Sequence, residues 1–409
     1  MNPVCRFCGA ALSHVVVDLG LSPLSNALLT REQLAQPEHR FPLRPLVCER
    51  CWLVQLPEFA PPQAIFGDYV YFSSFSEAWK AHVAHYAARM MQLLELDERS
   101  LVVEVGSNDG QLLRCFAQRN IPVLGIEPAA NVAAAAVASG IRTEVSFFGV
   151  QTATSLKGKY GAADLIVGNN VLAHVPDLND FVAGLRELLK PGGTITMEFP
   201  HLLRLLEHTE FDTIYHEHFS YFSLSVVERV FAAHGLQVTN AEELPTHGGS
   251  LRIYAAHAGK STRRSRAAQE IASQERAAGL ETPAVYERFA RDVVRAKKAL
   301  LDFFAAAAAQ GASVAGYGAP AKATTLLNYC GVDAMMLPYT VDRNPMKQGR
   351  FIPGVRIPIE QPATIAERQP AYLLLLPWNW AAEIIEQMAP IREWGGRFVV
   401  PIPKAAVLP

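Results

Sequence analysis

The chain has 409 residues, of which 50% are hydrophobic and 19% are charged, and its net charge at pH 7 is −2. This length predicts two or three domains, and the near balance of charges argues against nucleic acid or a membrane as a partner. No apolar run reaches transmembrane length, and the first residues, MNPVCRFCGA, lack the pattern of a signal peptide. We therefore expect a cytoplasmic protein.

Four of the six cysteines form two C-x-x-C pairs near the N-terminus, Cys5 with Cys8 and Cys48 with Cys51. Two such pairs supply four thiolates to a tetrahedral Zn²⁺. Because the protein fills all four positions, the metal is expected to be structural, holding together residues 1–70, a segment too small for a core of its own. A zinc-dependent hydrolase is the least favoured function, since no position remains for water.

Residues 71–258 alternate between helical and strand patterns, which predicts a parallel sheet covered on both faces. The alternation opens with a helical stretch at residues 77–96. Strands are expected at residues 101–105, 123–127, 164–168 and 194–199.

The most informative motif is VEVGSNDG, residues 103–110, at the turn between the first strand and a helix. Glycines there let the backbone approach a ligand closely, and Glu127 ends the next strand where such folds bind ribose hydroxyls. The G-x-x-x-G spacing disfavours a pyrophosphate site and favours S-adenosylmethionine, which has no phosphate. The alternative is an ordinary glycine-rich turn. The predicted cofactor site comprises Glu104, Gly106, Asn108, Asp109, Glu127, Pro128, Asn169 and Asn170.

Residues 211–223, FDTIYHEHFSYFS, place two histidines, a glutamate and two tyrosines within seven positions. Tyr215 and His218 would share one face of a helical turn. The set suits proton abstraction by a histidine, with a carboxylate to orient it. Two alternatives stay open: His216 and His218 as ligands of a second metal, or surface aromatics around a structural histidine. His174 follows the strand at residues 164–168, where α/β folds bind ligands.

A polar, alanine-rich stretch at residues 259–283 is predicted to begin a second, shorter α/β domain, residues 259–409. A long helix is expected at residues 284–310, followed by a strand, the turn GYGA and a helix that begins near Lys322. Such a helix N-terminus can bind an anion, and a structural turn with a solvated lysine is the alternative. Further strands are expected at residues 337–341, 371–376 and 397–402, and a helix at residues 381–391.

Together these features resemble the deoxysugar C-methyltransferase family, typified by the 3-C-methyltransferases of branched antibiotic and polysaccharide sugars. The resemblance covers nearly the whole chain and includes the two C-x-x-C pairs, VEVGSNDG, NNVLAHVP, YHEHFSYFS, THGGSLR, GYGAPAKATTLLNYCG and PWNW, in this order. It implies a zinc-binding N-terminal module, a central Rossmann-like methyltransferase domain that binds S-adenosylmethionine, and a smaller Rossmann-like C-terminal domain that helps to hold a nucleotide-linked 4-keto-sugar.

The resemblance also implies a reaction. A histidine base removes the C3 proton, which the C4 ketone acidifies, and the carbanion then takes the methyl group of S-adenosylmethionine. The base maps to His218, supported by Glu217, while Tyr215, Tyr71 and His174 map to groups that polarise and position the substrate. The implied substrate-binding residues are His247, Gly248, Tyr317, Lys322, Asn328, Lys347 and Arg350.

Two other functions stay open. An O- or N-methyltransferase acting on another metabolite would methylate its substrate without exchanging a carbon-bound proton. A cofactor-binding protein without catalysis is less favoured, because a binder has no need of the base in YHEHF. The expected assembly is a monomer or a homodimer.

Overall fold

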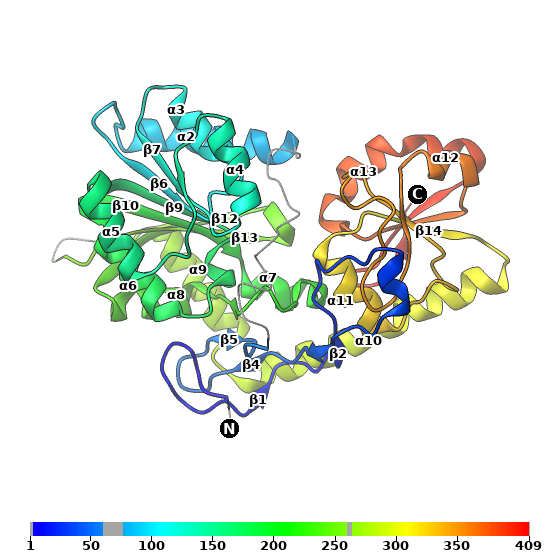
Figure 1. Ribbon diagram of the computed structural model, residues 1–409. Helices are drawn as coiled ribbons and strands as arrows, with labels where there is room; N and C mark the ends of the chain where they lie inside the picture. The colour runs from blue at the N-terminus through cyan, green and yellow to red at the C-terminus, as the bar shows by residue number, and fades with distance from the viewer. Residues whose placement is uncertain (1–2, 60–76, 260–263, 409) are drawn as a thin grey trace.

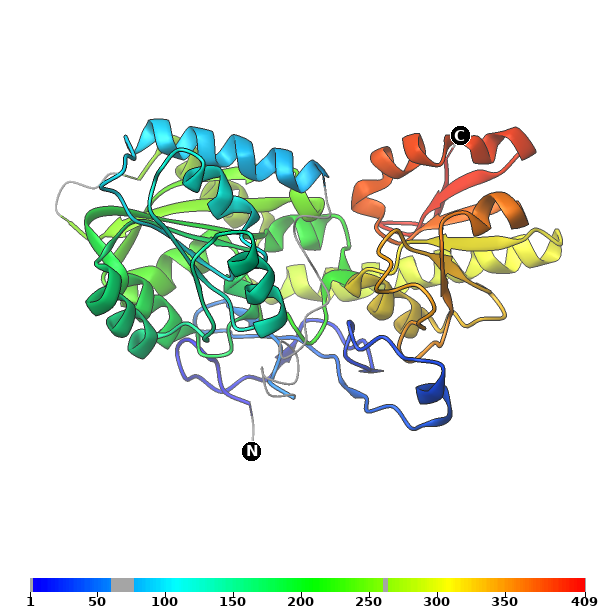
Figure 2. The ribbon, with the colours of Figure 1, turned by 45° about the horizontal axis from the view of Figure 1, so that its top comes forward.

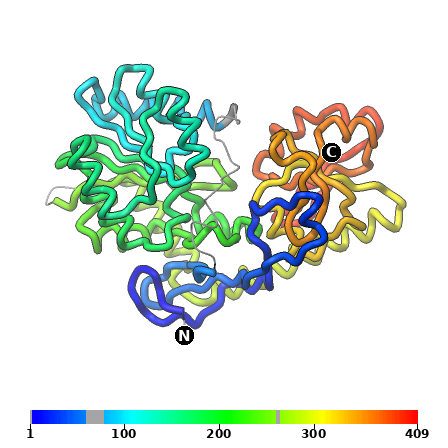
Figure 3. The backbone as a smooth tube through the Cα atoms, viewed as in Figure 1, coloured from blue at the N-terminus to red at the C-terminus, as the bar shows by residue number. Residues whose placement is uncertain are grey.

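The computed structural model describes residues 3–59, 77–259 and 264–408. Two α/β lobes stand side by side on an N-terminal segment, residues 3–59 (Figure 1). The N-terminal segment runs along the base of both lobes (Figure 3). This mixed α/β architecture with two Rossmann-like sheets confirms the predicted fold class. Within the described ranges, no helix is long and apolar enough to cross a membrane.

The first and last parts of the N-terminal segment join the central lobe through a shared sheet. Strands β1 (His14–Val15), β4 (Leu46–Val47) and β5 (Val54–Gln55) are antiparallel neighbours. β5 then pairs with β11 (Ser220–Tyr221), which directly follows the YHEHF motif. The cysteine-bearing segment is therefore hydrogen-bonded to the segment that carries the predicted base.

The middle part of the N-terminal segment, between β1 and β4, contacts the C-terminal lobe. Strands β2 (Leu21–Ser22) and β3 (Phe41–Pro42) form a ribbon, and the 3-10 helix η1 (Glu32–Ala35) lies between them in sequence. Leu29 forms a β-bridge with Phe351, in the lobe 322 positions further along the chain. The N-terminal segment thus bridges the two lobes.

The central sheet has seven strands in the order β12, β13, β10, β9, β6, β7, β8. All are parallel to one another except β13, which runs antiparallel to both of its neighbours. The direction of winding reverses at β6, and such a switch point is where open α/β sheets bind ligands. The strands are β6 (Val102–Val105), β7 (Val123–Ile126), β8 (Thr143–Glu144), β9 (Ala163–Asn169), β10 (Leu189–Pro200), β12 (Leu236–Leu244) and β13 (Ser250–His257).

Helices cover both faces of this sheet, so its central strands are apolar on both sides (Figure 2). One face carries α2 (Glu77–Leu93), α3 (Gln111–Ala117) and α4 (Ala130–Ala138). The other carries α5 (Val150–Tyr160), α6 (Leu178–Leu188) and α8 (Leu224–Ala233). Shorter helices in the connections are η3 (Leu172–His174), α7 (Leu202–Glu207), η4 (Phe211–Thr213) and η5 (Thr246–Gly248).

The stretch that the sequence suggested as a boundary, residues 259–283, contains an amphipathic helix of the central lobe. Helix α9 (Arg266–Ala278) buries Ala268, Ile271 and Ala272 in the core beneath the central sheet. Its buried Glu275 accepts hydrogen bonds from the backbone amides at the start of α8 and pairs with the imidazole of His201. The polar composition of this stretch reflects the exposed face of the helix.

The C-terminal sheet has six strands in the order β16, β15, β14, β17, β18, β19, and β19 is antiparallel to its neighbour. The winding again reverses at the first strand, β14. The strands are β14 (Val314–Tyr317), β15 (Thr340–Val341), β16 (Ile359–Glu360), β17 (Tyr372–Leu375), β18 (Arg397–Val400) and β19 (Ala406–Val407).

Helix α10 (Pro283–Ala309) runs beneath the two lobes and leads into this sheet (Figure 1). The predicted helix at residues 381–391 is divided into α13 (Ala381–Gln387) and the 3-10 helix η7 (Ala389–Trp394). Pro390 stands at the start of η7, where its missing N–H cannot continue the α-helix. The remaining helices are α11 (Ala321–Cys330), α12 (Thr364–Arg368) and η6 (Trp378–Trp380).

Candidate active site and metal centre

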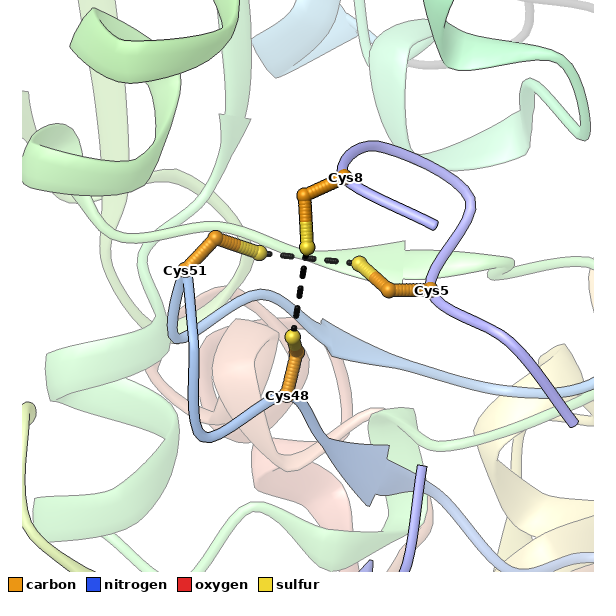
Figure 4. Close-up of side chains that lie close together, drawn as sticks. All are labelled: Cys5, Cys8, Cys48 and Cys51. Carbon is orange, nitrogen blue, oxygen red and sulfur yellow. Dashed lines mark hydrogen bonds between the residues drawn. The ribbon is translucent and has the colours of Figure 1, made fainter. Parts of the chain in front are cut away.

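The four N-terminal cysteines converge on one point (Figure 4). Their sulfur atoms all lie within 4.8 Å of one another, and the pairs Cys5–Cys51 and Cys8–Cys48 are separated by 3.5 Å. Four ligands at ~2.3 Å on a tetrahedron lie about 3.8 Å apart, so the thiols fit a tetrahedral Zn²⁺. None forms a disulfide. As four protein ligands leave no open position, the site is structural.

A cavity of about 700 Å³ lies between the two lobes. The C-terminal ends of β6, β7 and β9 open into it from the central sheet, and the loops after β14, β15 and β17 line it from the other sheet. The switch points of two Rossmann-like sheets therefore share one cavity. The predicted residues that line it are Glu104, Gly106, Asn108, Glu127, Pro128, Asn169, Asn170, His174, Tyr215, Glu217, His218, His247, Lys322 and Lys347.

The VEVGSNDG turn forms the cavity wall at the end of β6. Gly106 has φ of 68°, and a Cβ there would lie 3.1 Å from Val171 Cγ2, so this turn requires glycine. Glu127 Oε2 accepts a hydrogen bond from the backbone amide of Asn108 at 2.9 Å, and its Oε1 accepts one from Ala129 at 2.9 Å. The carboxylate is thus fixed, and lone pairs remain on both oxygens for ribose hydroxyls.

A buried carboxyl, one oxygen of which has no hydrogen-bond partner among the described residues, stands beside this turn. Glu104 is 6% exposed, and no partner for its Oε2 is found in the described part of the chain. Burial, and then the charges of Glu127 and Asp109, raise its pKa well above the usual range. A cationic ligand would stabilise the ionised form of this carboxyl. S-adenosylmethionine carries an ammonium and a sulfonium group, so the carboxyl groups at this turn fit the predicted cofactor.

Polar side chains at the end of β9 continue the cavity wall. Among the described residues, neither amide atom of the buried Asn169 side chain has a hydrogen-bond partner. Asn170 Nδ2 donates to Nε2 of His247 at 3.3 Å, which leaves the proton of the neutral imidazole on Nδ1. Burial lowers the pKa of His247 to about 4. Asn170 and His247 both have positive φ, of 55° and 56°. This conformation is uncommon for residues other than glycine, and it is found more often at ligand-binding sites.

His218 is held as a neutral imidazole in one tautomer. Its Nδ1 donates to the backbone carbonyl of Thr213 at 2.8 Å, so Nε2 keeps the lone pair. Burial, and then the neighbouring His174, lower the pKa of His218 well below its usual range. Residues 215–218 form a single hydrogen-bonded turn and not a helix, because the His218 amide donates to the Tyr215 carbonyl at 2.9 Å. The Tyr215 ring lies against the imidazole with centroids 4.0 Å apart, and the His174 ring lies 4.8 Å away.

Glu217 does not orient His218, which corrects the expectation from the sequence. Its Oε1 instead accepts a hydrogen bond of 2.7 Å from Nδ2 of Asn26, in the N-terminal segment, while the Thr213 carbonyl orients the imidazole. Burial raises the pKa of Glu217 to about 7, opposed by Asn26 and the charge of Lys347. A backbone acceptor leaves no trace in the sequence, so this orienting group could not be predicted.

His216 turns away from the cavity, which removes it as a partner of His218 in a second metal site. Its Nε2 lies 3.2 Å from the carbonyl of Pro42, and its ring packs edge-on against Phe41. Within the described ranges, the four cysteines form the one group of three or more residues that could hold a metal ion.

Several other predicted residues also lie outside the cavity lining. The Tyr317 ring points into the core of the C-terminal lobe, and its hydroxyl donates to Gln387 at 3.3 Å. Asn328 donates instead to the backbone carbonyls of Thr324 and Pro353. Tyr71 lies outside the described residues. The remaining predicted residues that do not line the cavity are Asp109, Gly248 and Arg350.

Lys322 enters the cavity wall at the start of α11. Its Nζ donates to Asn379 Oδ1 at 2.8 Å and lies 4.4 Å from the centroid of the Trp378 ring. Burial lowers its pKa, while Asp212 and Glu210 oppose that shift. The PWNW motif therefore supplies side chains to the site. Cavity-lining residues for which sequence reasoning assigned no role include Asn26, Trp79, Phe147, Phe148, Asn379 and Trp380.

The fold and the site define a methyltransferase. Three family models match consecutive parts of the chain: "Putative zinc binding domain" at residues 5–66, "Methyltransferase domain" at residues 79–241 and "C-methyltransferase C-terminal domain" at residues 245–403. The four-cysteine cluster lies within the first match, and the VEVGSNDG turn and the predicted base lie within the second.

C-methyltransferase NovU of Streptomyces niveus is 38% identical to this chain over 404 residues, which cover 99% of the chain and 96% of that protein. The chain belongs to this family, the S-adenosylmethionine-dependent C-methyltransferases.

Among solved structures, the PH0226 protein of Pyrococcus horikoshii OT3 is 14% identical, with a TM-score of 0.37 over 49% of this chain and 100% of its own. The CcbJ methyltransferase of Streptomyces caelestis is 12% identical, with a TM-score of 0.36 over 47% of this chain and 98% of its own.

Proposed function

We propose that this enzyme transfers a methyl group from S-adenosylmethionine to C3 of a nucleotide-linked 4-keto-deoxysugar, in the biosynthesis of a branched sugar. The observation that carries the proposal is His218, a buried neutral imidazole whose Nδ1–H is engaged by the Thr213 carbonyl. Its Nε2 is therefore available to accept a proton in the cavity wall. A saturated carbon such as C3 must lose a proton before it can attack the methyl group of a sulfonium ion, and a ketone beside it makes that loss feasible.

The side chains around His218 suit the charge that develops during proton removal. When the C3 proton moves to Nε2 of His218, negative charge spreads to the C4 oxygen of the sugar. Tyr215 and His174 lie against His218 and carry phenol and imidazole donors for such an oxygen. Burial holds the pKa of His174 at about 4, so its imidazole is neutral. When bound, S-adenosylmethionine supplies the electrophilic methyl group.

The proposal assigns a role to each part of the chain. Residues 1–70 carry the zinc and support the site, residues 71–258 bind S-adenosylmethionine, and residues 259–409 help to bind the nucleotide sugar. Lys322 and Lys347 support the last assignment, because both bring a cationic side chain to the cavity from the C-terminal lobe. The diphosphate group of the nucleotide is the anionic part of the proposed substrate, and such a group is bound by cationic side chains.

The proposal is tested by incubating the enzyme with S-adenosylmethionine and a panel of nucleotide-linked 4-keto-6-deoxysugars, with the products read by mass spectrometry. A second reaction in deuterated water, with S-adenosylhomocysteine in place of the methyl donor, should exchange the C3 proton of an accepted sugar. Methylation of a hydroxyl or an amine without C–H exchange would support the O- or N-methyltransferase alternative and contradict the proposal.

A further inference from the structure

Phe219, the residue after His218, joins the two histidine-bearing segments of the cavity to the N-terminal segment. Its backbone amide donates to the carbonyl of Ala173 at 2.7 Å, beside His174. Its own carbonyl accepts from the backbone amide of Leu56 at 3.0 Å, directly after β5. A shift of this residue would therefore move both histidines relative to the cavity.

Arg6, which lies inside the first C-x-x-C pair, reaches into the same junction. Its NH1 donates to the carbonyl of Pro176 at 3.0 Å, and its NH2 donates to the carbonyl of Leu56 at 2.5 Å. The guanidinium carbon also lies 5.4 Å from the centroid of the Phe219 ring. One side chain thus contacts the loop after His174, the end of β5 and the residue after His218.

The backbone of Arg6 is fixed by neighbours of the metal centre. Its amide donates to Oε1 of Gln55 at 2.8 Å, and Nε2 of the same glutamine donates to Sγ of Cys5 at 3.2 Å. On the other side, Nδ2 of Asn179 in α6 donates to the carbonyls of Arg6 and Phe7 at 3.1 and 3.0 Å. The position of the guanidinium is therefore tied to the zinc knuckle.

We propose that Arg6 is a positioning residue, which fixes the segments of His174 and His218 against the zinc-binding segment in the geometry that the reaction requires. Arginine suits this task because its planar fork directs two N–H donors to two different carbonyls while its face packs on an aromatic ring. Lysine, with a single ammonium group, cannot reproduce this set of contacts. The catalytic part of this inference rests on the proposed function, because it takes His218 to be the base.

The test compares Arg6→Met and Arg6→Lys with Arg50→Met as a matched control. Arg50 lies inside the second C-x-x-C pair but is exposed, and none of the described residues forms a hydrogen bond or ion pair with its side chain. Each full-length variant is assayed for zinc content, affinity for S-adenosylmethionine, kcat and KM. In histidine-labelled protein, the imidazole NMR signals of His174 and His218 are assigned by single substitutions and compared with wild type.

We expect both Arg6 variants to keep about one zinc per chain and near-normal cofactor affinity, with shifted signals from His174 and His218. Their kcat should fall by about 10²-fold with little change in KM, the scale of a 1 Å displacement at a reacting centre. Arg50→Met should match wild type in every measurement.

Unchanged imidazole signals, unchanged kcat, or a loss of activity that tracks a loss of zinc would each overturn the proposal. If Arg6→Met does not fold, Arg6→Lys decides by the same measurements. The imidazole signals require no sugar, so they test Arg6 even if the wild-type enzyme accepts no keto-sugar, a result that would count against the proposed function alone.

Discussion

The side-chain amide of Asn26 donates a 2.7 Å hydrogen bond to Oε1 of Glu217, across 191 positions of sequence. Both residues line the cavity between the lobes, so the N-terminal segment contributes directly to its wall. Burial raises the pKa of Glu217 to about 7, and the Asn26 amide and the charge of Lys347 limit that rise. The carboxyl therefore titrates near neutral pH, well above the range of an exposed glutamate.

Replacing Asn26 should move the titration of Glu217 to higher pH. The amide N–H favours the ionised carboxylate, so Asn26→Ala removes a stabilising contact of that form and should raise the pKa above 7. The measurement is an NMR pH titration of glutamate-labelled protein, in which Glu217→Gln identifies the signal. A Glu217 midpoint that is the same in Asn26→Ala and wild type would show that the hydrogen bond does not control this carboxyl.

Removing the imidazole of His218 should abolish proton exchange at C3 while leaving the cofactor site intact. His218→Ala is expected to lower exchange and turnover by at least ~10²-fold, the usual contribution of a general base. Affinity for S-adenosylmethionine, measured by calorimetry, should stay near wild type, because the residue acts on the sugar. His85→Ala, at an exposed histidine of α2, is the control. Near-normal turnover in His218→Ala would move the role of the base to His174 or Tyr215.

The parts of the site that the sequence predicted are those determined by local requirements. The turn at Gly106 needs a residue that tolerates positive φ beside Val171, and such a turn between a strand and a helix can be recognised from a few residues. The two cysteine pairs likewise carry their ligand spacing in the sequence. Strands such as β6 were predictable because a sheet that is covered on both faces selects continuous apolar runs.

The parts that could not be predicted depend on contacts between distant segments. Nothing near Asn26 or Arg6 in the sequence indicates that their partners are Glu217 and the carbonyl of Pro176. The family resemblance assigned Tyr317 to the substrate, but the structure turns its ring toward the core that contains Ile384 of α13. Which face of a short strand meets the ligand is decided by tertiary packing, and not by a motif.

Binding of S-adenosylmethionine should release a proton from Glu104. This carboxyl has a raised pKa in the cofactor-free protein, because it is buried beside the charges of Glu127 and Asp109. A cationic ligand favours its ionised form, so affinity should increase with pH on the acidic side of that raised pKa. Calorimetry in buffers of different ionisation enthalpy, repeated over a range of pH, measures the proton release.

Glu104→Gln should abolish this proton release and weaken binding by roughly tenfold or more, the scale of a lost contact to a charged group. Glu98→Gln, at an exposed position just before β6, should behave as wild type. Equal proton release in wild type and Glu104→Gln would assign the released proton to another group.

The protein should contain about one zinc per chain, bound by the four cysteines, and its stability should depend on that metal. Metal binding to a structural four-cysteine site contributes directly to the free energy of folding. Cys8→Ser should therefore lose the zinc and lower the unfolding temperature, as should a chelator added to wild type. Cys115→Ser is the control, since Cys115 lies in α3, away from the cluster. Elemental analysis and thermal unfolding provide the measurements.

The effect should extend beyond the metal centre, because β5 of the zinc-binding segment pairs with β11 of the central lobe. Hydrogen exchange should therefore accelerate at the amide of Tyr221, in β11, when the zinc is removed, while amides in β15 of the C-terminal lobe keep their protection. Protein purified without chelator that contains no zinc, or that contains disulfides among these four cysteines, would contradict the assignment of the site. If zinc loss does not accelerate exchange at β11, the assignment of the metal site stands, but the metal does not stabilise the segment that carries His218.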